Sequence, residues 1–262
     1  MRIGKFITFP FVLVPGFLAL SLAGCPVWQA QDTPVDEFKV TEPDTKSQFY
    51  LYVPSEYDAD HKWPLVVTLH GTPGYDNAYR QVKEWKALAE EHGFIVLAPE
   101  LISVQGVLPV ARSTRLRQLA TDERRVLAAM KETRNRYNID ERNVMITGFS
   151  AGGFPLYYIT MRNPEKFNTL AARMSNCDME ILKILPVSTA SKNINMLIYF
   201  SKTGINPIYS GHNPIARQSW SAFEYLRRQD HRSIKVKAVE GGHQRRPEIA
   251  YAFWRKHWPG PE

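Results

Sequence analysis

The sequence lacks the patterns of several protein classes. It has only two cysteines in 262 residues, and it has no internal repeat and no linker that would separate a second domain. No basic stripe interleaved with aromatic residues accompanies its formal charge of +7, which argues against a nucleic-acid partner. With 44% hydrophobic and 23% charged residues, the composition is that of an ordinary globular protein with enough residues for a substantial core.

The N-terminal region has no apolar run that would form an uninterrupted membrane-spanning helix. Such a helix needs about 20 apolar residues, and Pro10 and Pro15 interrupt the segment. Residues 1–24 instead have the layout of a signal peptide, with a short basic region, an apolar region and a close of small residues. The tetrad Leu22-Ala23-Gly24-Cys25 resembles the bacterial lipoprotein signal, in which the cysteine becomes the lipidated first residue of the mature protein.

This resemblance implies an exported protein that is tethered to a membrane of a bacterial envelope by lipid on Cys25. A secreted or periplasmic protein without the anchor is the alternative. Residues 25–37 carry no apolar periodicity and are expected to form a polar tether. If Cys25 is lipidated, Cys177 has no partner for an intramolecular disulfide, and the exported domain depends on its core for stability.

Strand and helix patterns alternate over residues 38–262, which are expected to form a single α/β domain. Residues 38–53 alternate with period two around a Pro-Asp turn and predict an antiparallel hairpin. Continuous apolar runs over 63–69 and 94–99 suit strands buried on both faces of a parallel sheet. The expected architecture is a mostly parallel central sheet with an N-terminal hairpin and helices on both faces. The other expected elements are strands over 144–146, 169–175, 195–200 and 234–238, and helices over 77–92, over 121–137, from the motif at 150 to about 162, from 213 and from 247.

Two of these helices carry more detailed predictions. Thr121 is expected to cap the second helix, with Asp122 in its first turn. The helix that opens at Asn213 is expected to bury Trp220. Two segments without clear periodicity are expected to form lid or specificity loops: 101–116 and 203–212.

The motif Gly148-Phe149-Ser150-Ala151-Gly152 joins the end of an apolar strand to the start of a helix. Its glycines permit a turn that is too tight for residues carrying a Cβ atom, so the serine at the apex is exposed at the C-terminal edge of the sheet. The Ala151 N–H, at the start of the helix, can donate to negative charge that develops beside Ser150. The pattern is that of a nucleophile elbow, although G-x-S-x-G also occurs by chance in glycine-containing turns.

Two further stretches follow strands of the same sheet, namely His70-Gly71-Thr72 and Glu240-Gly241-Gly242-His243. In such sheets ligands bind beyond the C-terminal ends of the strands. The order along the chain is a glycine loop, then Ser150, then His243, which is the order of the α/β-hydrolases. The three stretches together predict a serine hydrolase. His70 itself is expected to shape its loop rather than to react.

Three segments carry a resemblance to a known family: Leu51-Tyr52-Val53-Pro54, residues 64–71, and Tyr137-Asn138-Ile139-Asp140 running on to residue 153. They resemble the secreted esterase family of polyhydroxybutyrate depolymerases and feruloyl or acetylxylan esterases, and the similarity extends from residue 38 to the C-terminus. It implies an α/β-hydrolase fold, no cofactor or metal, and hydrolysis of carboxylic esters through an acyl-enzyme. The implied substrates are small, polysaccharide-linked or polyester compounds.

Matched to this family residue by residue, Ser150 is the nucleophile and His243 the general base, which takes the serine proton and returns one to the leaving group. The backbone N–H groups of Ala151 and of either Gly71 or Thr72 match the oxyanion hole.

The third member of the triad departs from the family pattern, because Asn206 stands where an aspartate is expected. An amide can orient the imidazole but cannot stabilise imidazolium, and in trypsin the same exchange lowers turnover by about 10⁴. Asp178, after the preceding strand, is a second candidate acid, and Glu240 is a third. Asp178 can also be read simply as a helix N-cap.

Two other functions fit the same residues. A peptidase or thioesterase of the same fold is one, since His70-Gly71-Thr72-Pro73-Gly74 is similar to proline-peptidase-like members. A non-catalytic binding protein with a decayed triad is the other, because of Asn206. The acyl group, the alcohol group, the face of the membrane and the oligomeric state do not follow from the sequence.

Overall fold

A central sheet of eight strands organises the computed structural model, which describes residues 38–105, 110–203 and 213–259. The strand order is β1-β2-β4-β3-β5-β6-β7-β8. β2 runs antiparallel to both β1 and β4, and the remaining neighbours are parallel. The predicted hairpin and mostly parallel sheet are therefore confirmed. The strands are β1 (Phe38–Thr41), β2 (Gln48–Tyr52), β3 (Trp63–Leu69), β4 (Ile95–Pro99), β5 (Ile139–Phe149), β6 (Thr169–Arg173), β7 (Asn195–Ser201) and β8 (Ile234–Val239).

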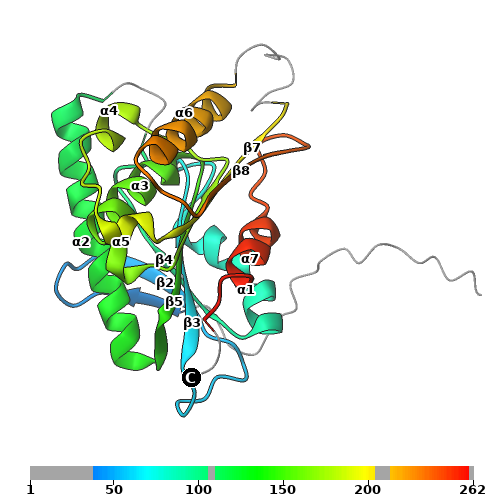
Figure 1. Cartoon of the computed structure of the whole chain (residues 1–262). Helices are drawn as coiled ribbons and strands as arrows, with labels where there is room; N and C mark the ends of the chain where they lie inside the picture. The colour runs from blue at the N-terminus through cyan, green and yellow to red at the C-terminus, as the bar shows by residue number, and fades with distance from the viewer. Residues whose placement is uncertain (1–37, 106–109, 204–212, 260–262) are drawn as a thin grey trace, which may run out of the picture.

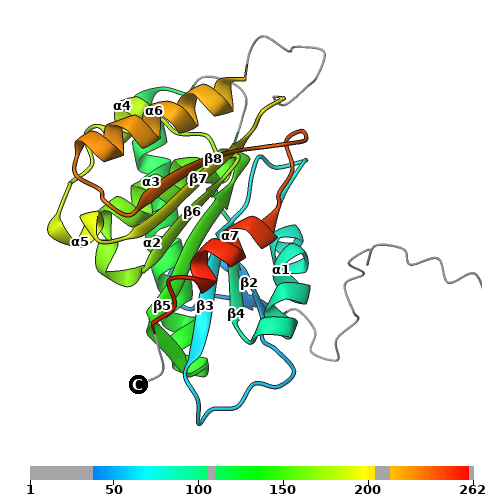
Figure 2. The same ribbon diagram turned by 45° about the vertical axis from the view of Figure 1, so that its right-hand side comes forward.

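Helices cover both faces of this sheet, as Figures 1 and 2 show. α1 and α7 lie together on one face, and α2, α3 and α6 lie on the other, with the short α4 and α5 beside them. The helices are α1 (Ala78–His92), α2 (Arg112–Arg136), α3 (Gly153–Arg162), α4 (Met179–Leu182), α5 (Thr189–Lys192), α6 (Pro214–Arg228) and α7 (Pro247–Arg255).

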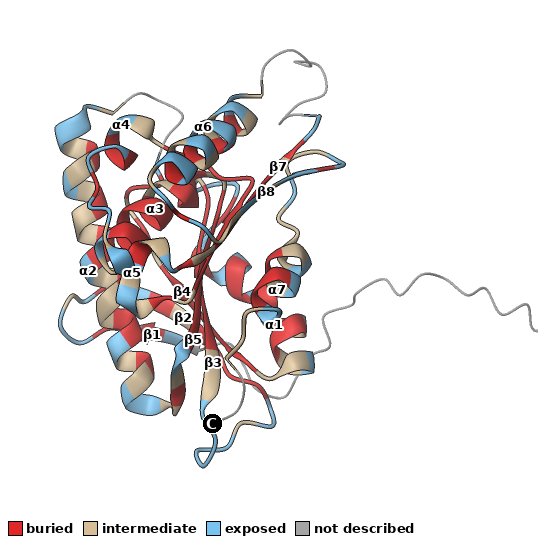
Figure 3. Cartoon of the chain, in the orientation of Figure 1, coloured by how far each residue is buried: buried red, intermediate tan, exposed pale blue. Residues whose placement is uncertain are grey.

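The two faces of β3 enter two separate parts of the core. Leu65, Val67 and Leu69 pack into the core beneath α2 and α3, whereas Val66 packs on the opposite side with residues of α1 and α7. All four side chains are fully buried. Such a strand is apolar in most positions, because alternate side chains point to opposite faces and both faces are covered. Figure 3 shows this burial concentrated in the sheet and on the inward sides of the helices.

Strand register places the ends of β3, β5 and β6 at one edge. Leu69 pairs with Gly148, and Phe149 pairs with Arg173. Because the strands are parallel, the segments that follow them, including the one that begins at Ser150, leave the sheet on the same side.

The ends of α1 follow the sequence chemistry. The Asn77 side chain accepts a hydrogen bond from the Arg80 N–H at 2.8 Å, and Gly93 ends the helix with a φ of 69°. Asn213 caps α6 in the same way and is followed by Pro214 in the first helical position. These helix boundaries are confirmed.

The predicted start of α2 is wrong. The helix begins at Arg112, and the Thr121 hydroxyl donates to the carbonyl of Arg117 inside it. Asp122 is fully buried and accepts hydrogen bonds from the N–H groups of Ile102 and Ser103, so its carboxylate holds the preceding loop. Thr121 therefore lies inside the helix and caps nothing, and the last residues of the expected 101–116 loop are helical.

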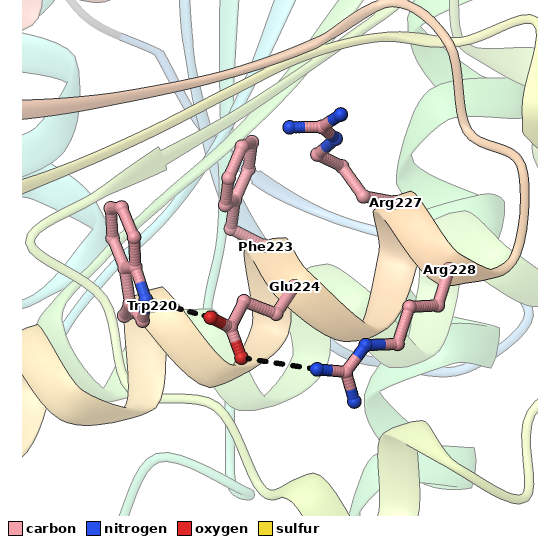
Figure 4. Close-up of a pocket in the computed structure, with 5 residues that line it drawn as sticks. All are labelled: Trp220, Phe223, Glu224, Arg227 and Arg228. Atoms are coloured by element: carbon pink, nitrogen blue, oxygen red, sulfur yellow. Dashed lines mark hydrogen bonds and ion pairs between the residues drawn. The ribbon is translucent and has the colours of Figure 1, made fainter.

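The predicted burial of Trp220 is also wrong, because its side chain is 48% exposed. The buried stripe of α6 consists of Ile215, Ser219, Ala222 and Leu226, which follow the helical period one position away from Trp220. Figure 4 shows Trp220 on the outer face of the helix, where its indole N–H donates to Glu224 at 3.0 Å. With its neighbours on α6 it lines a shallow pocket of about 410 Å³.

Several predictions fall outside the described residues. These are the signal peptide, the tether, Cys25, and nearly all of the 203–212 loop with Asn206. Within the described ranges, none of the helices has both the length and the apolarity of a membrane span. Cys177 is buried with a free thiol, whose pKa burial raises.

Candidate active site

Ser150 occupies a strained turn between β5 and α3. Its φ of 52° lies in the left-handed region, and the next two residues complete a short 3₁₀ turn. A residue with a Cβ atom pays on the order of 1–3 kcal/mol for such a conformation, which persists only where its surroundings impose it. The serine is half-buried, so its hydroxyl is accessible from the edge of the sheet. This is the geometry of a nucleophile elbow.

The glycines of the motif are required by close packing of backbone. A Cβ atom on Gly152 would come within 2.4 Å of the Leu69 carbonyl oxygen, and one on Gly148 would come within 2.6 Å of the Gly152 carbonyl oxygen. Backbone atoms cannot yield to such contacts as a flexible side chain can. The turn therefore packs directly against the end of β3, which brings Ser150 beside the loop that follows that strand.

His70 shapes that loop, as predicted. Its ring is buried, its Nε2 accepts a hydrogen bond from the Leu101 N–H at 3.1 Å, and its Nδ1 lies 2.8 Å from the Gly71 carbonyl oxygen. Since Nε2 accepts, Nδ1 carries the proton and donates to Gly71. The imidazole therefore joins two loops, with both nitrogens in use.

Gly71 lies against the serine, but its N–H group is already engaged. A Cβ atom on Gly71 would stand 3.2 Å from the Ser150 Cβ, and the Gly71 N–H donates to Asp76 Oδ2 at 2.7 Å. Of the two N–H groups that the sequence offered from this loop, the one of Thr72 has no acceptor among the described residues. Ala151 lies in the first turn of the 3₁₀ segment, where N–H groups have no intrahelical partner. Of the predicted oxyanion-hole donors, the N–H groups of Thr72 and Ala151 are therefore the ones without an acceptor among the described residues.

His243 reaches the same edge from the loop after β8. Its ring stacks on Phe149, the residue before the serine, with centroids 4.7 Å apart and planes inclined by 28°. No hydrogen bond between Ser150 and His243 is present within the described ranges. The stacking on Phe149 is therefore what holds the imidazole near the serine. Three segments that are distant in sequence, carrying Thr72, Ser150 with Ala151, and His243, thus come together at this edge of the sheet.

The pKa of His243 is lowered to about 4. Burial is the largest cause, the positive charge of Arg245 adds to it, and the Asp76 carboxylate opposes it. At neutral pH the imidazole is therefore uncharged, which is the form that can accept a proton from a serine hydroxyl.

The candidate acids are placed elsewhere in the described structure. Asp178 caps α4 by accepting hydrogen bonds from the Glu180 and Ile181 N–H groups at 3.0 and 3.2 Å. Its plain interpretation as an N-cap is therefore confirmed, and within the described ranges neither a hydrogen bond nor an ion pair joins it to His243. Glu240 is exposed and pairs with Lys202 at 2.6 Å. Asn206 lies outside the described residues.

Sequence reasoning missed Asp76 and Arg245, which are the charged residues that act on His243. Asp76 follows the glycine loop by a few residues, and Arg245 is two residues after the histidine, but neither position belongs to a recognisable motif. Within residues 38–105, 110–203 and 213–259, no three metal-ligating side chains come together.

The sheet order, the serine at a left-handed turn after β5 and the histidine after the last strand define the α/β-hydrolase fold class. Over residues 48–190 the chain matches the model of the dienelactone hydrolase family, and it belongs to that family.

Individual relatives agree with this assignment. A bifunctional acetylxylan esterase/xylanase from Neocallimastix patriciarum is 29% identical over 122 residues, which are 47% of this chain and 17% of that protein. Feruloyl esterase B from Thermothelomyces thermophilus is 24% identical over 157 residues, 60% of this chain and 53% of the relative. The chain thus spans about half or less of the length of these curated relatives.

Among solved structures, a ferulic acid esterase from Anaeromyces mucronatus in complex with ferulic acid superposes with a TM-score of 0.62. The match covers 89% of this chain and 94% of that one at 14% sequence identity. At this identity the likeness supports the fold alone.

Proposed function

We propose that this protein is a serine hydrolase that cleaves carboxylic esters through an acyl-enzyme intermediate. The observation that carries the proposal is the left-handed Ser150 at the β5 turn, with free N–H groups and an uncharged histidine at the same edge of the sheet. A strained, accessible serine in this position has no structural purpose, because glycine would fit the turn at lower cost.

In the proposed mechanism, the Ser150 oxygen attacks the acyl carbon while His243 accepts the hydroxyl proton. The N–H groups of Thr72 and Ala151 stabilise the negative oxygen of the tetrahedral intermediate. When the C–O bond breaks, the imidazolium returns its proton to the departing alcohol, and Ser150 remains acylated. Water then attacks the acyl-enzyme with His243 again as base, which releases the carboxylic acid and restores the serine.

Polysaccharide-linked esters are the proposed substrates. The names of the curated relatives support this choice, since acetylxylan and feruloyl esterases act on acyl groups carried by polysaccharides. We also propose that the protein is exported and held at a bacterial membrane by lipid on Cys25, on the strength of the Leu22-Ala23-Gly24-Cys25 tetrad. A Cys25→Ser change is expected to release the protein from membranes, and unchanged partitioning would refute the anchor.

The proposed function is tested by covalent labelling with a fluorophosphonate probe, followed by a hydrolysis panel. Labelling is expected to map to Ser150, and the panel of acetyl, feruloyl and hydroxybutyrate esters, thioesters and aminoacyl amides identifies the bond that is cleaved. Turnover of the amides or thioesters alone would replace the esterase by a peptidase or a thioesterase. Correctly folded protein that is neither labelled nor active would overturn the proposal.

A non-catalytic binding protein is the second candidate. The observation that favours it is that no carboxylate among the described residues hydrogen-bonds to His243. Turnover by the purified protein that disappears in Ser150→Ala would exclude this candidate, because a contaminating hydrolase would be unaffected by the substitution.

A further inference from the structure

Arg245 ties the loop that carries His243 to the loop after β3. One of its terminal guanidinium nitrogens donates to Asp76 Oδ1 at 3.0 Å and to the Tyr75 carbonyl at 3.2 Å. Its Nε lies 3.1 Å from Glu84 Oε2 on α1, an ion pair whose geometry is not that of a hydrogen bond. Both acids are shielded from water, with side chains 1% and 11% exposed. Charge-assisted contacts in such surroundings are stronger than on the surface.

The second carboxylate oxygen of Asp76 binds the loop that follows β3. Oδ2 accepts the Gly71 N–H at 2.7 Å and the Gln81 side-chain amide at 2.8 Å. One carboxylate therefore connects the histidine loop, through Arg245, with the loop that lies against Ser150. Because this carboxylate engages the Gly71 N–H, the Thr72 N–H is left as the neighbouring donor without an acceptor among the described residues.

A fully buried arginine, Arg173, contacts both Arg245 and its partner Glu84, and so holds the bridge that Arg245 forms between the two loops. Arg173, at the end of β6, hydrogen-bonds to the hydroxyls of Thr68 and Thr147 at 3.1 and 3.0 Å and pairs with Glu84. It also donates to the Arg245 carbonyl at 3.4 Å. The Thr68, Thr147 and Arg173 positions lie on three neighbouring strands, so the bridge rests on the rigid part of the sheet rather than on loops.

Arg245 and Asp76 also influence the pKa of His243. The Arg245 guanidinium lies 5.2 Å from the centroid of the Phe149 ring on which His243 stacks. Arg245 and Asp76 are the charged groups that act on the imidazole, with opposite signs. Removing Arg245 takes away a positive charge and leaves the Asp76 carboxylate unopposed, so the histidine binds a proton more readily.

We propose that the Arg245–Asp76 pair is a positioning device for the reaction at Ser150. It holds His243 and the Thr72 N–H in a fixed mutual arrangement, so that the base and the oxyanion donors act on the same carbonyl group. The inference rests on the proposed function. Within the described ranges neither Arg245 nor Asp76 has a hydrogen bond or an ion pair with Ser150; the two residues hold the loops that carry Thr72 and His243.

Arg245→Gln is the decisive variant, and Arg246→Gln is its matched control. The control removes the same charge from the neighbouring residue, whose guanidinium pairs with the exposed Glu248. We expect Arg245→Gln to lower kcat by about 10²-fold, the size of effect that small misplacements of reacting groups produce, while KM changes far less. The acid limb of the pH–rate profile is expected to move to higher pH, and an NMR titration of His243 is expected to show the same rise in its pKa.

Asp76→Asn and the Asp76→Asn/Arg245→Gln double variant complete the experiment. If the two residues act as a unit, the double variant loses little more than the worse single variant, and Arg245→Lys regains part of the lost kcat. Circular dichroism and thermal unfolding identify any variant that fails to fold, and Arg245→Lys then carries the comparison.

The outcomes separate this inference from the proposed function. A wild-type protein without turnover or fluorophosphonate labelling overturns both. An active wild type in which Arg245→Gln matches Arg246→Gln in kcat, in acid limb and in histidine pKa overturns the positioning role alone, as do independent, multiplicative losses in the double variant.

Discussion

The imidazole of His243 lies against the ring of Phe149, with centroids 4.7 Å apart, and Phe149 is the residue immediately before Ser150. The candidate base is therefore located by an aromatic contact with the strand that delivers the candidate nucleophile. A stacked pair of this kind contributes about 0.5–1.5 kcal/mol beyond area burial, and it restricts the plane of the imidazole ring.

Removing the aromatic ring of Phe149, on which His243 stacks, is expected to lower the turnover rate. Phe149→Leu removes the aromatic face, so His243 loses its fixed orientation and kcat falls by about 10-fold, a part of the 10²–10⁴ that a general base contributes. Phe253→Leu is the control, because Phe253 is equally buried and its ring contacts a different histidine, His257, at 4.5 Å. Steady-state kinetics and thermal unfolding of both variants make the comparison; equal kcat values would contradict a role for the stacking.

Replacing the nucleophile separates activity from strain. Ser150→Ala is expected to abolish fluorophosphonate labelling and to lower turnover by about 10⁴-fold or more, with little change in stability because the strained φ of 52° is retained. Ser150→Gly abolishes activity equally but relieves the strain, and its unfolding free energy is expected to exceed that of Ser150→Ala by about 1 kcal/mol. Denaturant titration measures the difference; a less stable glycine variant would show that the turn is unstrained.

The acid limb of the pH–rate profile is expected near pH 4. The base is active when neutral, and the pKa of His243 in the folded protein is about 4, so kcat/KM stays level down to that region and falls below it. A midpoint near 6.5, the ordinary value for histidine, would contradict the lowered pKa.

The same shift has a defined effect on stability. Because the folded-state pKa lies below the unfolded value, the unfolded chain binds the proton more readily. The contribution of His243 to stability is therefore complete above about pH 6.5 and is lost as the pH falls toward 4. Unfolding curves of the wild type and His243→Gln across this window measure it, and parallel pH dependences would contradict it.

Two glycines provide a matched test of the elbow packing. Gly152→Ala places a Cβ atom 2.4 Å from a backbone oxygen, whereas Gly242→Ala in the histidine loop meets nothing within 4 Å. We expect Gly152→Ala to destabilise the fold by at least about 3 kcal/mol or to prevent folding, and Gly242→Ala to fold normally. Expression and thermal unfolding make the measurement; equal stability of the two variants would mean that the turn can rearrange.

The unusual asparagine allows a gain-of-function test. If Asn206 stands at the acid position, Asn206→Asp is expected to raise kcat by up to about 10⁴-fold, the loss caused by the reverse exchange in trypsin. Asp178→Ala is the comparison, and is expected to cost about 1 kcal/mol of stability through the lost N-cap while kcat is retained. A large loss of kcat in Asp178→Ala, with no gain in Asn206→Asp, would instead assign the acid to Asp178.

Local chemistry explains which features the sequence could predict. The buried strand over 63–69 and the helix over 77–92 each depend on a few adjacent residues, and each was confirmed as β3 and α1. The predictions of a helix start at Thr121 and of a buried Trp220 were wrong, because each depended on contacts with other parts of the molecule. The carboxylate of Asp122 accepts hydrogen bonds from the N–H groups of the preceding loop, and the stripe of α6 that contains Ser219, one position from Trp220, packs against the core.

The α/β-hydrolase fold and the three stretches that meet at the edge of the sheet could be predicted from the chain, because hydrophobic period, glycine spacing and the order of motifs can be read in the sequence. The N–H groups that remain without an acceptor, the ring on which His243 stacks and the charges that act on it are seen only in the folded molecule. These features depend on contacts such as Arg245 with Asp76, which lie 169 positions apart and leave no pattern in the chain.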